Sequence, residues 1–251
     1  MPFEPENELE HSLLLAANDP AHRPQFYQDF AKSLVFAITA GPGPDEPKER
    51  VTKSDEQFNL VTWERDGQSV IPMFSSLRRL EAAVSEPASY IALNAIEFLR
   101  MTRGMPLVLN PAQEVGKEFT VAEIEAILDG SIGKPSETRT IRSGTQVLVG
   151  QPKNYPHELV GALTRYFQTN RSVRKAKMGH VFIAGQDESA HTLIAIDAGA
   201  DFDKVLPSAL IITKEVYLPD PPVDIVRWDR NWETLLKDIT PFYRKKFLGI
   251  F

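Results

Sequence analysis

The fold is decided by one stretch, Gly104-Met-Pro-Leu-Val-Leu-Asn-Pro-Ala-Gln-Glu-Val-Gly-Lys-Glu-Phe-Thr-Val-Ala-Glu-Ile-Glu-Ala-Ile-Leu-Asp-Gly130. Residues 105–109 form a short apolar run between Gly104 and the pair Asn110-Pro111. An apolar run of this length between two breakers predicts a buried strand rather than a helix. The stretch therefore begins with a strand of the core.

The second half of the stretch predicts a capped helix. Thr120 and Glu123 have the spacing of a capping box, in which the threonine hydroxyl accepts from the backbone N–H of Glu123 and the carboxylate reaches back to the cap residue. Ile124 and Leu128 then lie on one helical face, and Gly130 can adopt the left-handed conformation that ends a helix. The order is strand, loop, helix.

The residues before this stretch predict further helices and strands. They are helices over 7–18 and 25–33, a strand over 34–38, a hairpin turning at Asp66-Gly67, a helix capped by Ser75 or Ser76, a strand over 90–93 and a helix capped by Asn94. Residues 44–54 are polar and charged, which predicts a surface excursion. We expect an α+β domain over residues 1–130, with a mixed sheet covered by helices.

The residues after the stretch predict a linker and a second domain. Residues 131–143 are rich in Ser, Thr, Gly and charge and lack periodicity, as linkers do. Residues 144–251 predict the order βαββαβ followed by a terminal helix and an apolar tail, with a hairpin near 186–189 and Pro207 kinking or restarting the second helix. That order is the split βαβ pattern, so we expect a ferredoxin-like C-terminal domain.

Composition excludes several classes of protein. The chain has 251 residues, 42% of them hydrophobic and 25% charged, and no apolar run approaches the ~20 residues that span a bilayer. It contains no cysteine, which removes disulfides, thiolate nucleophiles and thiolate metal sites. The net charge of −6 disfavours nucleic acid as a partner, and the acidic N-terminus favours the cytoplasm over secretion.

Two sets of motifs resemble a known family. Leu107-Val-Leu-Asn-Pro111, Gly116-Lys117 and Phe119-Thr120 resemble the end of the N-terminal domain of the bacterial enhanced serine sensitivity (SseB) family. Gly150-Gln-Pro152, followed by Tyr155-Pro156, resembles the C-terminal domain of the same family. The resemblance implies two α+β domains, and its name points toward amino-acid metabolism, but it implies no reaction, ligand or catalytic residue.

Recognised catalytic motifs are absent from the sequence. A phosphate-binding loop around Gly116-Lys117 would need glycine at position 111 and Ser or Thr at 118, which are Pro and Glu. There is neither a Gly-x-Ser-x-Gly elbow nor a His-Glu-x-x-His pair. Lys117 therefore remains only as a loop cation that could help to bind a partner.

One group of residues resembles a metal site. His180 and His191 could face each other across the predicted hairpin, with Asp187 and Glu188 at its tip, and imidazole with carboxylate could hold zinc or nickel. Hairpin tips are commonly acidic for solubility alone. We therefore expect no metal and no cofactor, although these four residues are the best candidates for an enzyme.

The strongest local charge lies where a strand begins, at Arg174, Lys175 and Lys177. Alternation in a strand places the two lysines on one face and Arg174 on the other. Lysines often protect an edge strand against unwanted pairing. The alternative is a patch that binds an anion or RNA, although RNA would need solvent-facing aromatic residues and Phe182 is the single candidate in this strand.

The C-terminal tail carries Phe242, Tyr243, Phe247 and Phe251 around a short basic run. So many exposed apolar side chains would mark a contact surface. Either the tail packs on its own domain, or it docks on another chain. The sequence thus favours a non-enzymatic module that binds an unknown protein, with a regulatory domain for an amino acid or other metabolite as the alternative and an uncharacterised enzyme third.

Overall fold

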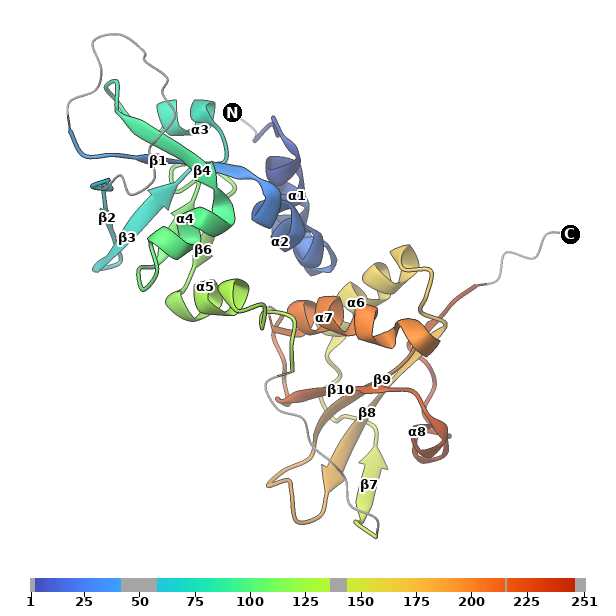
Figure 1. The fold of residues 1–251 in the computed structure, drawn as a ribbon. Coiled ribbons are helices and arrows are strands. Elements are labelled where there is room, and N and C mark those ends of the chain that lie inside the picture. Colours follow the sequence, from blue (N-terminus) through green and yellow to red (C-terminus); the bar gives the residue numbers. More distant parts are fainter. Residues whose placement is uncertain (1–2, 42–57, 136–143, 215, 247–251) are drawn as a thin grey trace, which may run out of the picture. The chain divides into compact units, whose positions relative to one another are not determined.

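The structure is a computed structural model, which describes residues 3–41, 58–135, 144–214 and 216–246. The predicted excursion over 44–54, most of the predicted linker, Phe247 and Phe251 lie outside these residues. The chain divides into two compact units, Met1–Ile132 and Gly133–Phe251. Each unit is described by itself (Figure 1).

The elements of the N-terminal unit follow the predicted order. They are α1 (Glu8–Asn18), η1 (Pro20–His22), α2 (Arg23–Lys32), β1 (Leu34–Ile38), β2 (Trp63–Arg65), β3 (Gln68–Met73), α3 (Leu77–Glu81), β4 (Tyr90–Asn94), α4 (Ala95–Met101), β5 (Leu107–Leu109), β6 (Lys117–Phe119) and α5 (Val121–Leu128). Asp66 and Gly67 have φ values of 51° and 76°, as the predicted tight hairpin between β2 and β3 requires. The short strand β6 was not predicted.

Two sheets meet through a pair of phenylalanines. β1 pairs with β4 antiparallel, and the second sheet has the order β2-β3-β5-β6, in which β3 and β5 are parallel. The backbones of Phe36 and Phe74 exchange hydrogen bonds of 2.9 and 2.8 Å, which joins β1 to the end of β3. The predicted central strands, β1 and β5, therefore belong to one mixed layer.

Aromatic side chains fill the space between helices and sheet. Phe30 of α2 stacks on Phe119 of β6 with ring centroids 4.9 Å apart, and Phe26 lies beside both. All three rings are buried, as is Ile124 of α5. Thr120 caps α5, because its hydroxyl accepts from Glu123 N at 3.2 Å. This confirms the predicted capped helix.

The C-terminal unit also keeps its predicted element order. Its elements are β7 (Val147–Gly150), α6 (His157–Thr169), β8 (Lys175–Ile183), β9 (His191–Asp197), η2 (Gly199–Asp201), α7 (Phe202–Lys214), β10 (Val223–Arg227), α8 (Arg230–Leu235) and β11 (Tyr243–Arg244). The fold is thus α+β, as expected. The pairing of its strands decides which α+β fold it is.

The ferredoxin-like arrangement is not confirmed. The strand order is β10-β9-β8-β11, with β7 also paired to β8. β9 and β10 are adjacent and parallel across α7, whereas the split βαβ pattern places another strand between them. Element order alone could not distinguish the two, because both have the sequence βαββαβ.

Each face of this sheet is covered differently. Buried side chains of α6 and α7, such as Leu163 and Ile212, pack on Met178 and Ile194. Leu236 and Ile239, which follow α8, pack on Val181 and Leu193 on the other face. Figure 1 shows α8 lying apart from α6 and α7. The odd-numbered side chains of β8 point to this second face of the sheet, which we call the α8 face.

Pro207 does not restart α7, which corrects that part of the prediction. The helix runs through it from Phe202 to Lys214. Its ring packs closely on Gly133, where an added Cβ would lie 2.8 Å from the Pro207 Cβ. Tertiary packing therefore stabilises the helix against one missing N–H. None of the described helices is long and apolar enough to cross a membrane.

Candidate functional site

A cleft of about 460 Å³ lies on the α8 face of the C-terminal sheet. Lys175 and Lys177 enter it from β8, because alternate residues of a strand point to the same face. Arg244 enters from β11, where it pairs in register with Lys175. Three cations from two neighbouring strands therefore lie on one face.

Lys177 is the most unusual of the three because only 8% of it is exposed. Its ammonium donates to the carbonyl oxygen of Leu236 at 2.6 Å, at the C-terminal end of α8, where backbone carbonyls favour a positive charge. Burial lowers the pKa of Lys177, and the charges of Lys175 and Arg244 lower it further, although nearby carboxylates oppose this. Placing these positive charges close together therefore costs free energy.

The walls of the cleft contain one aromatic ring and two carboxylates. The Lys175 ammonium lies 3.8 Å from the centroid of the Trp228 ring, which is a cation–π contact. Glu233 and Asp238 also line the cleft. Within the described part of the chain, however, neither forms an ion pair with Lys175, Lys177 or Arg244. The arrangement can bind an anion.

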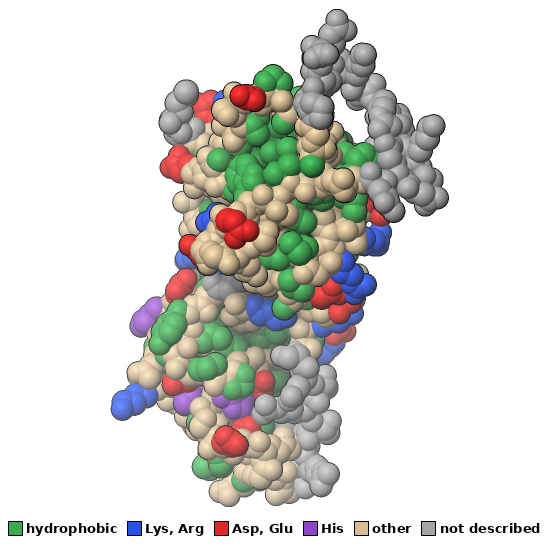
Figure 2. All heavy atoms as spheres, turned by 90° about the vertical axis from the view of Figure 1, so that its left-hand side faces the viewer, with side chains coloured by type: hydrophobic (Ala, Val, Ile, Leu, Met, Phe, Trp, Pro, Cys, Tyr) green, Lys and Arg blue, Asp and Glu red, His purple; other side chains and the backbone are tan. Residues whose placement is uncertain are grey.

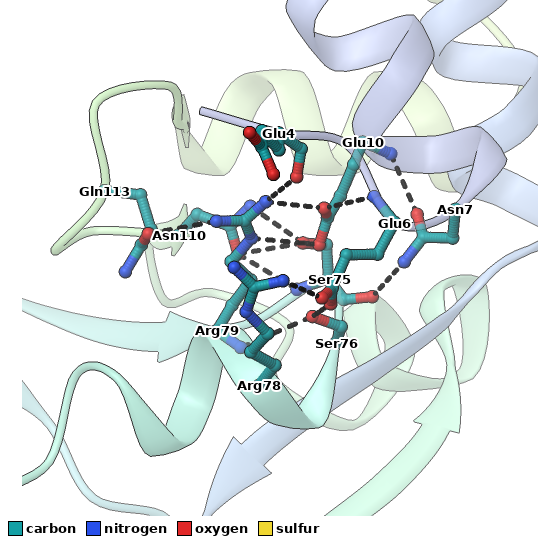
Figure 3. Close-up of polar contacts among 10 residues, drawn as sticks. All are labelled: Glu4, Glu6, Asn7, Glu10, Ser75, Ser76, Arg78, Arg79, Asn110 and Gln113. Atoms are coloured by element: carbon teal, nitrogen blue, oxygen red, sulfur yellow. Dashed lines mark hydrogen bonds and ion pairs between the residues drawn. The ribbon is translucent and has the colours of Figure 1, made fainter. Parts of the chain in front are cut away.

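A second polar cluster is buried in the N-terminal unit (Figure 3). Glu10 of α1 is fully buried and pairs with Arg79 of α3, whose Nη2 lies 2.9 Å from Glu10 Oε2. Ser75 donates from Oγ to Glu10 Oε1 at 2.7 Å. Asn110, held at φ 53°, accepts from Ser75 N at 3.0 Å and donates to Ser75 Oγ at 2.8 Å. The cluster ties α1 to two loops that follow strands of the sheet.

This cluster is closed on itself. Burial by itself would raise the pKa of Glu10, but hydrogen bonds from Arg79, Ser75 and the Glu6 amide, together with the Arg79 charge, hold it below its ordinary value. Arg79 is further occupied by Gln113 Oε1 at 3.3 Å and by the Phe3 ring at 4.1 Å. A carboxylate so fully engaged and excluded from water cannot act as a general base. The cluster is structural.

The four metal candidates do not all come together, although His191 Nδ1 lies 3.5 Å from Asp187 Oδ2. His180 pairs in register with Thr192, and His191 pairs with Val181, so the two imidazoles lie on opposite faces of the sheet. His191 Nε2 instead contacts Asp224 Oδ2 at 2.9 Å. Among the described residues, no group of three His, Asp or Glu side chains is placed to hold a metal ion.

Other predicted site residues have partners within the chain. Lys117 forms an ion pair with Glu123 at 2.9 Å, and Glu123 also accepts from the Tyr27 hydroxyl at 2.5 Å rather than reaching back to cap its helix. Arg174 pairs with Asp197 at 2.5 Å. Neither basic residue contributes to the cleft.

The described part of the tail packs on its own unit. Tyr243 is buried, and its hydroxyl donates to the carbonyl oxygen of Phe167 at 2.9 Å. Phe242 stacks on Phe167 with ring centroids 6.2 Å apart. Phe242 and Tyr243 therefore pack on their own unit, which is one of the two arrangements that the sequence left open.

Figure 2 shows hydrophobic side chains at the surface of the N-terminal unit. Leu34 is 57% exposed and Tyr90 43% exposed, on the paired strands β1 and β4. Phe36 lies between them in register and its ring is 6.0 Å from that of Tyr90. Strand β4 lies at the edge of its sheet and carries no charged residue.

Comparison with known proteins assigns both units. Residues 9–126 match the model of the SseB protein N-terminal domain, and residues 141–245 match that of the SseB protein C-terminal domain. The chain belongs to the SseB family. It is 30% identical to Protein SseB of Escherichia coli (strain K12) over 252 residues, which cover 98% of this chain and 95% of that protein. Protein SseB of Shigella flexneri matches equally well. No solved structure matches the chain.

Both polar clusters lie inside the SseB domains. The SseB C-terminal match ends at residue 245, so it includes Lys175, Lys177 and Arg244. Sequence reasoning placed Lys175 and Lys177 on one face, but its preferred interpretation of a solvated edge strand is wrong, because β8 is paired on both sides and Lys177 is buried. It also missed Arg244 and Trp228. Arg244 stood in the basic run of the tail, yet only its pairing with β8 brings it to the lysines.

Proposed function

We propose that this SseB-family chain is a cytoplasmic, non-enzymatic binding protein whose C-terminal cleft takes part in recognition. The observation that carries the proposal is the group formed by Lys175, Lys177 and Arg244, which has no carboxylate partner within the described residues. Like charges opposite each other in a sheet destabilise it. A group of this kind is typical of a site where a binding partner supplies the opposite charge.

The polar groups elsewhere support binding rather than catalysis. Glu10, Ser75 and Asn110 satisfy one another in the core of the N-terminal unit. His191 is buried and bonded to Asp224. Catalysis by a nucleophile and base needs both groups within reach of a substrate, and these groups face the interior.

Co-purification from the native cell tests the proposal. The tagged full chain is compared with the double variant K175M/R244M, and the surface variant K204M is the matched control because Lys204 is exposed and paired with Asp201. Point variants are used because a truncation of the tail before β11 would remove that strand and the Tyr243 hydrogen bond from the fold. A stoichiometric protein or co-purifying metabolite retained by wild type and K204M but lost in the double variant is the expected result.

Activity is measured on the same preparations. Reproducible turnover of a small metabolite by the pure protein, abolished by a single substitution in the cleft, would contradict a non-enzymatic role. If K204M also lost every co-purifying species, the loss seen in the double variant would report on folding rather than on recognition.

A regulatory domain that binds a metabolite is the second candidate. It is favoured by the size of the cleft, about 460 Å³, since small-molecule sites commonly span roughly 300–1,000 Å³. A metabolite present at about 100 times its Kd should stabilise the folded protein by about 2.7 kcal/mol. A thermal-shift screen of a metabolite library would detect that change and separate this candidate from a module that binds only proteins.

A further inference from the structure

Four cations line the cleft, and three of them, Lys175, Lys177 and Arg244, come from neighbouring strands and surround a common space. Lys175 and Arg244 are direct cross-strand partners, and such partners have Cβ atoms ~5 Å apart. Lys177 lies two residues along β8 on the same face. Any small anion that reaches one of these side chains is therefore within reach of the others.

The carboxylate directly opposite Lys175 in the sheet is engaged elsewhere, and among the described residues Glu233 and Asp238 line the cleft without forming an ion pair with its strand cations. Asp197 stands opposite Lys175 in the register of β8 and β9. Its carboxylate is bound instead by Arg174 at 2.5 Å. Lys177 is held by a backbone carbonyl, which satisfies a hydrogen bond but does not cancel its charge.

We infer that this cleft binds the carboxylate or phosphate group of a small acidic molecule. Lys175 and Arg244 contact the anion, and the buried Lys177 adds positive charge nearby. The inference rests on the proposed function, because it names the chemistry of the ligand for the same site. Trp228 lies under Lys175, so an anion bound there changes the surroundings of its indole ring. An arginine can hold either group through two parallel hydrogen bonds.

The lining favours a compact anion over a polyanion. Glu233 and Asp238 stand in the same cleft and would repel a second negative group. The whole chain carries a net charge of −6, which opposes a nucleic-acid strand. The ligand is therefore a small molecule with one localised anionic group.

Titration of the full chain with two probes tests the inference. Inorganic phosphate and acetate are each added at constant ionic strength, with sodium chloride as the third titrant, while NMR follows the indole N–H of Trp228, assigned with W228F. We expect a saturable shift with phosphate or acetate and none with chloride. The probe that binds more tightly identifies phosphate or carboxylate as the group recognised.

Variants locate the binding. K175M and R244M should each weaken affinity by about tenfold or more, because a hydrogen bond to a charged group contributes roughly 1.5–3 kcal/mol. K204M should bind like wild type. The indole resonance of Trp232, which packs on the same face, verifies in each variant that the unit is folded.

Two results would overturn the inference. One is the absence of a saturable Trp228 shift with both probes in the folded wild-type chain. The other is equal affinity of wild type and K175M/R244M. Either result leaves the proposed non-enzymatic role standing, because that role is tested separately by co-purification and by the search for metabolite turnover.

Discussion

Replacing Glu10 by Gln should lower the free energy of unfolding of the N-terminal unit by about 3–5 kcal/mol, the usual cost of removing one partner from a buried ion pair. The side chain of Glu10 is fully buried and that of Arg79 is 7% exposed. The substitution keeps the shape of the side chain. It leaves the guanidinium charge without its carboxylate.

The hydrogen bonds explain why glutamine cannot substitute. Oε1 of Glu10 accepts from Ser75 Oγ at 2.7 Å and from Arg79 Nε at 3.2 Å. Oε2 accepts from Arg79 Nη2 and from the Glu6 amide, both at 2.9 Å. Both oxygens therefore face two donors each. With its amide NH2 in place of Oε2, glutamine would point at two N–H donors and leave them unsatisfied. With the NH2 in place of Oε1, it would face Arg79 Nε–H, while the Ser75 hydroxyl could turn to Asn110 Oδ1 at 3.1 Å.

The neighbouring pair provides a matched control. Glu6 and Arg78 form an ion pair one turn away, with side chains 30% and 61% exposed. E6Q should therefore cost no more than about 1 kcal/mol, as for other exposed pairs. Urea unfolding is followed by the fluorescence of Trp63 in a W228F/W232F background, so that only the N-terminal unit is observed. Equal losses in E10Q and E6Q would refute the reasoning.

The pH dependence has a definite sign. The pKa of Glu10 is lower in the folded state than its ordinary value of 4.5, so its contribution to stability is fully present above that value and is lost as pH falls below it. E10Q lacks this titration. The difference in unfolding free energy between wild type and E10Q should therefore narrow from pH 7 toward pH 3, and a constant difference would contradict the assignment.

Three further substitutions have clear expected outcomes. G116A should destabilise the N-terminal unit by about 1–3 kcal/mol in urea unfolding, because its Cβ would lie 2.6 and 2.9 Å from two backbone carbonyl oxygens; unfolding like wild type would contradict this. Y243F should cost about 1 kcal/mol through its lost hydrogen bond. Burial raises the pKa of Tyr243, so the wild type should lose stability as pH rises above its ordinary value of 10.0, and Y243F should lose less. N110G relieves a positive φ of 53° but removes the buried bonds to Ser75, so a net loss of about 1–3 kcal/mol is expected in the same assay, and a gain would show that backbone strain dominates.

Local signals in the sequence predicted the elements well because those signals act over a few residues. The strand β1 coincides with its predicted residues 34–38, since an apolar run and its flanking breakers are neighbours in the chain. The cap of α5 by Thr120 is equally local. The partner of Glu123 was not predicted, because Tyr27 and Lys117 reach it through tertiary structure.

Long-range features could not be predicted in the same way. The βαββαβ order allows several strand orders, and only packing selects the parallel neighbours β9 and β10. Glu10 has the appearance of a surface charge on an amphipathic helix until Arg79 is brought beside it. For the cleft, alternation identified its two lysines, whereas Arg244 required knowledge that the tail pairs with β8.

The short strand β11 also sets an order of events during synthesis. One edge of β8 is completed by β7 from before it and by β11 from after it. The N-terminal unit has all its residues once residue 132 has left the ribosome, and domains of this kind fold as units in chain order. The C-terminal sheet must wait until Tyr243 emerges, with part of the β8 edge uncovered meanwhile. A nascent chain stalled before that point thus combines a finished first domain with an open sheet edge, the kind of surface that chaperones and proteases recognise.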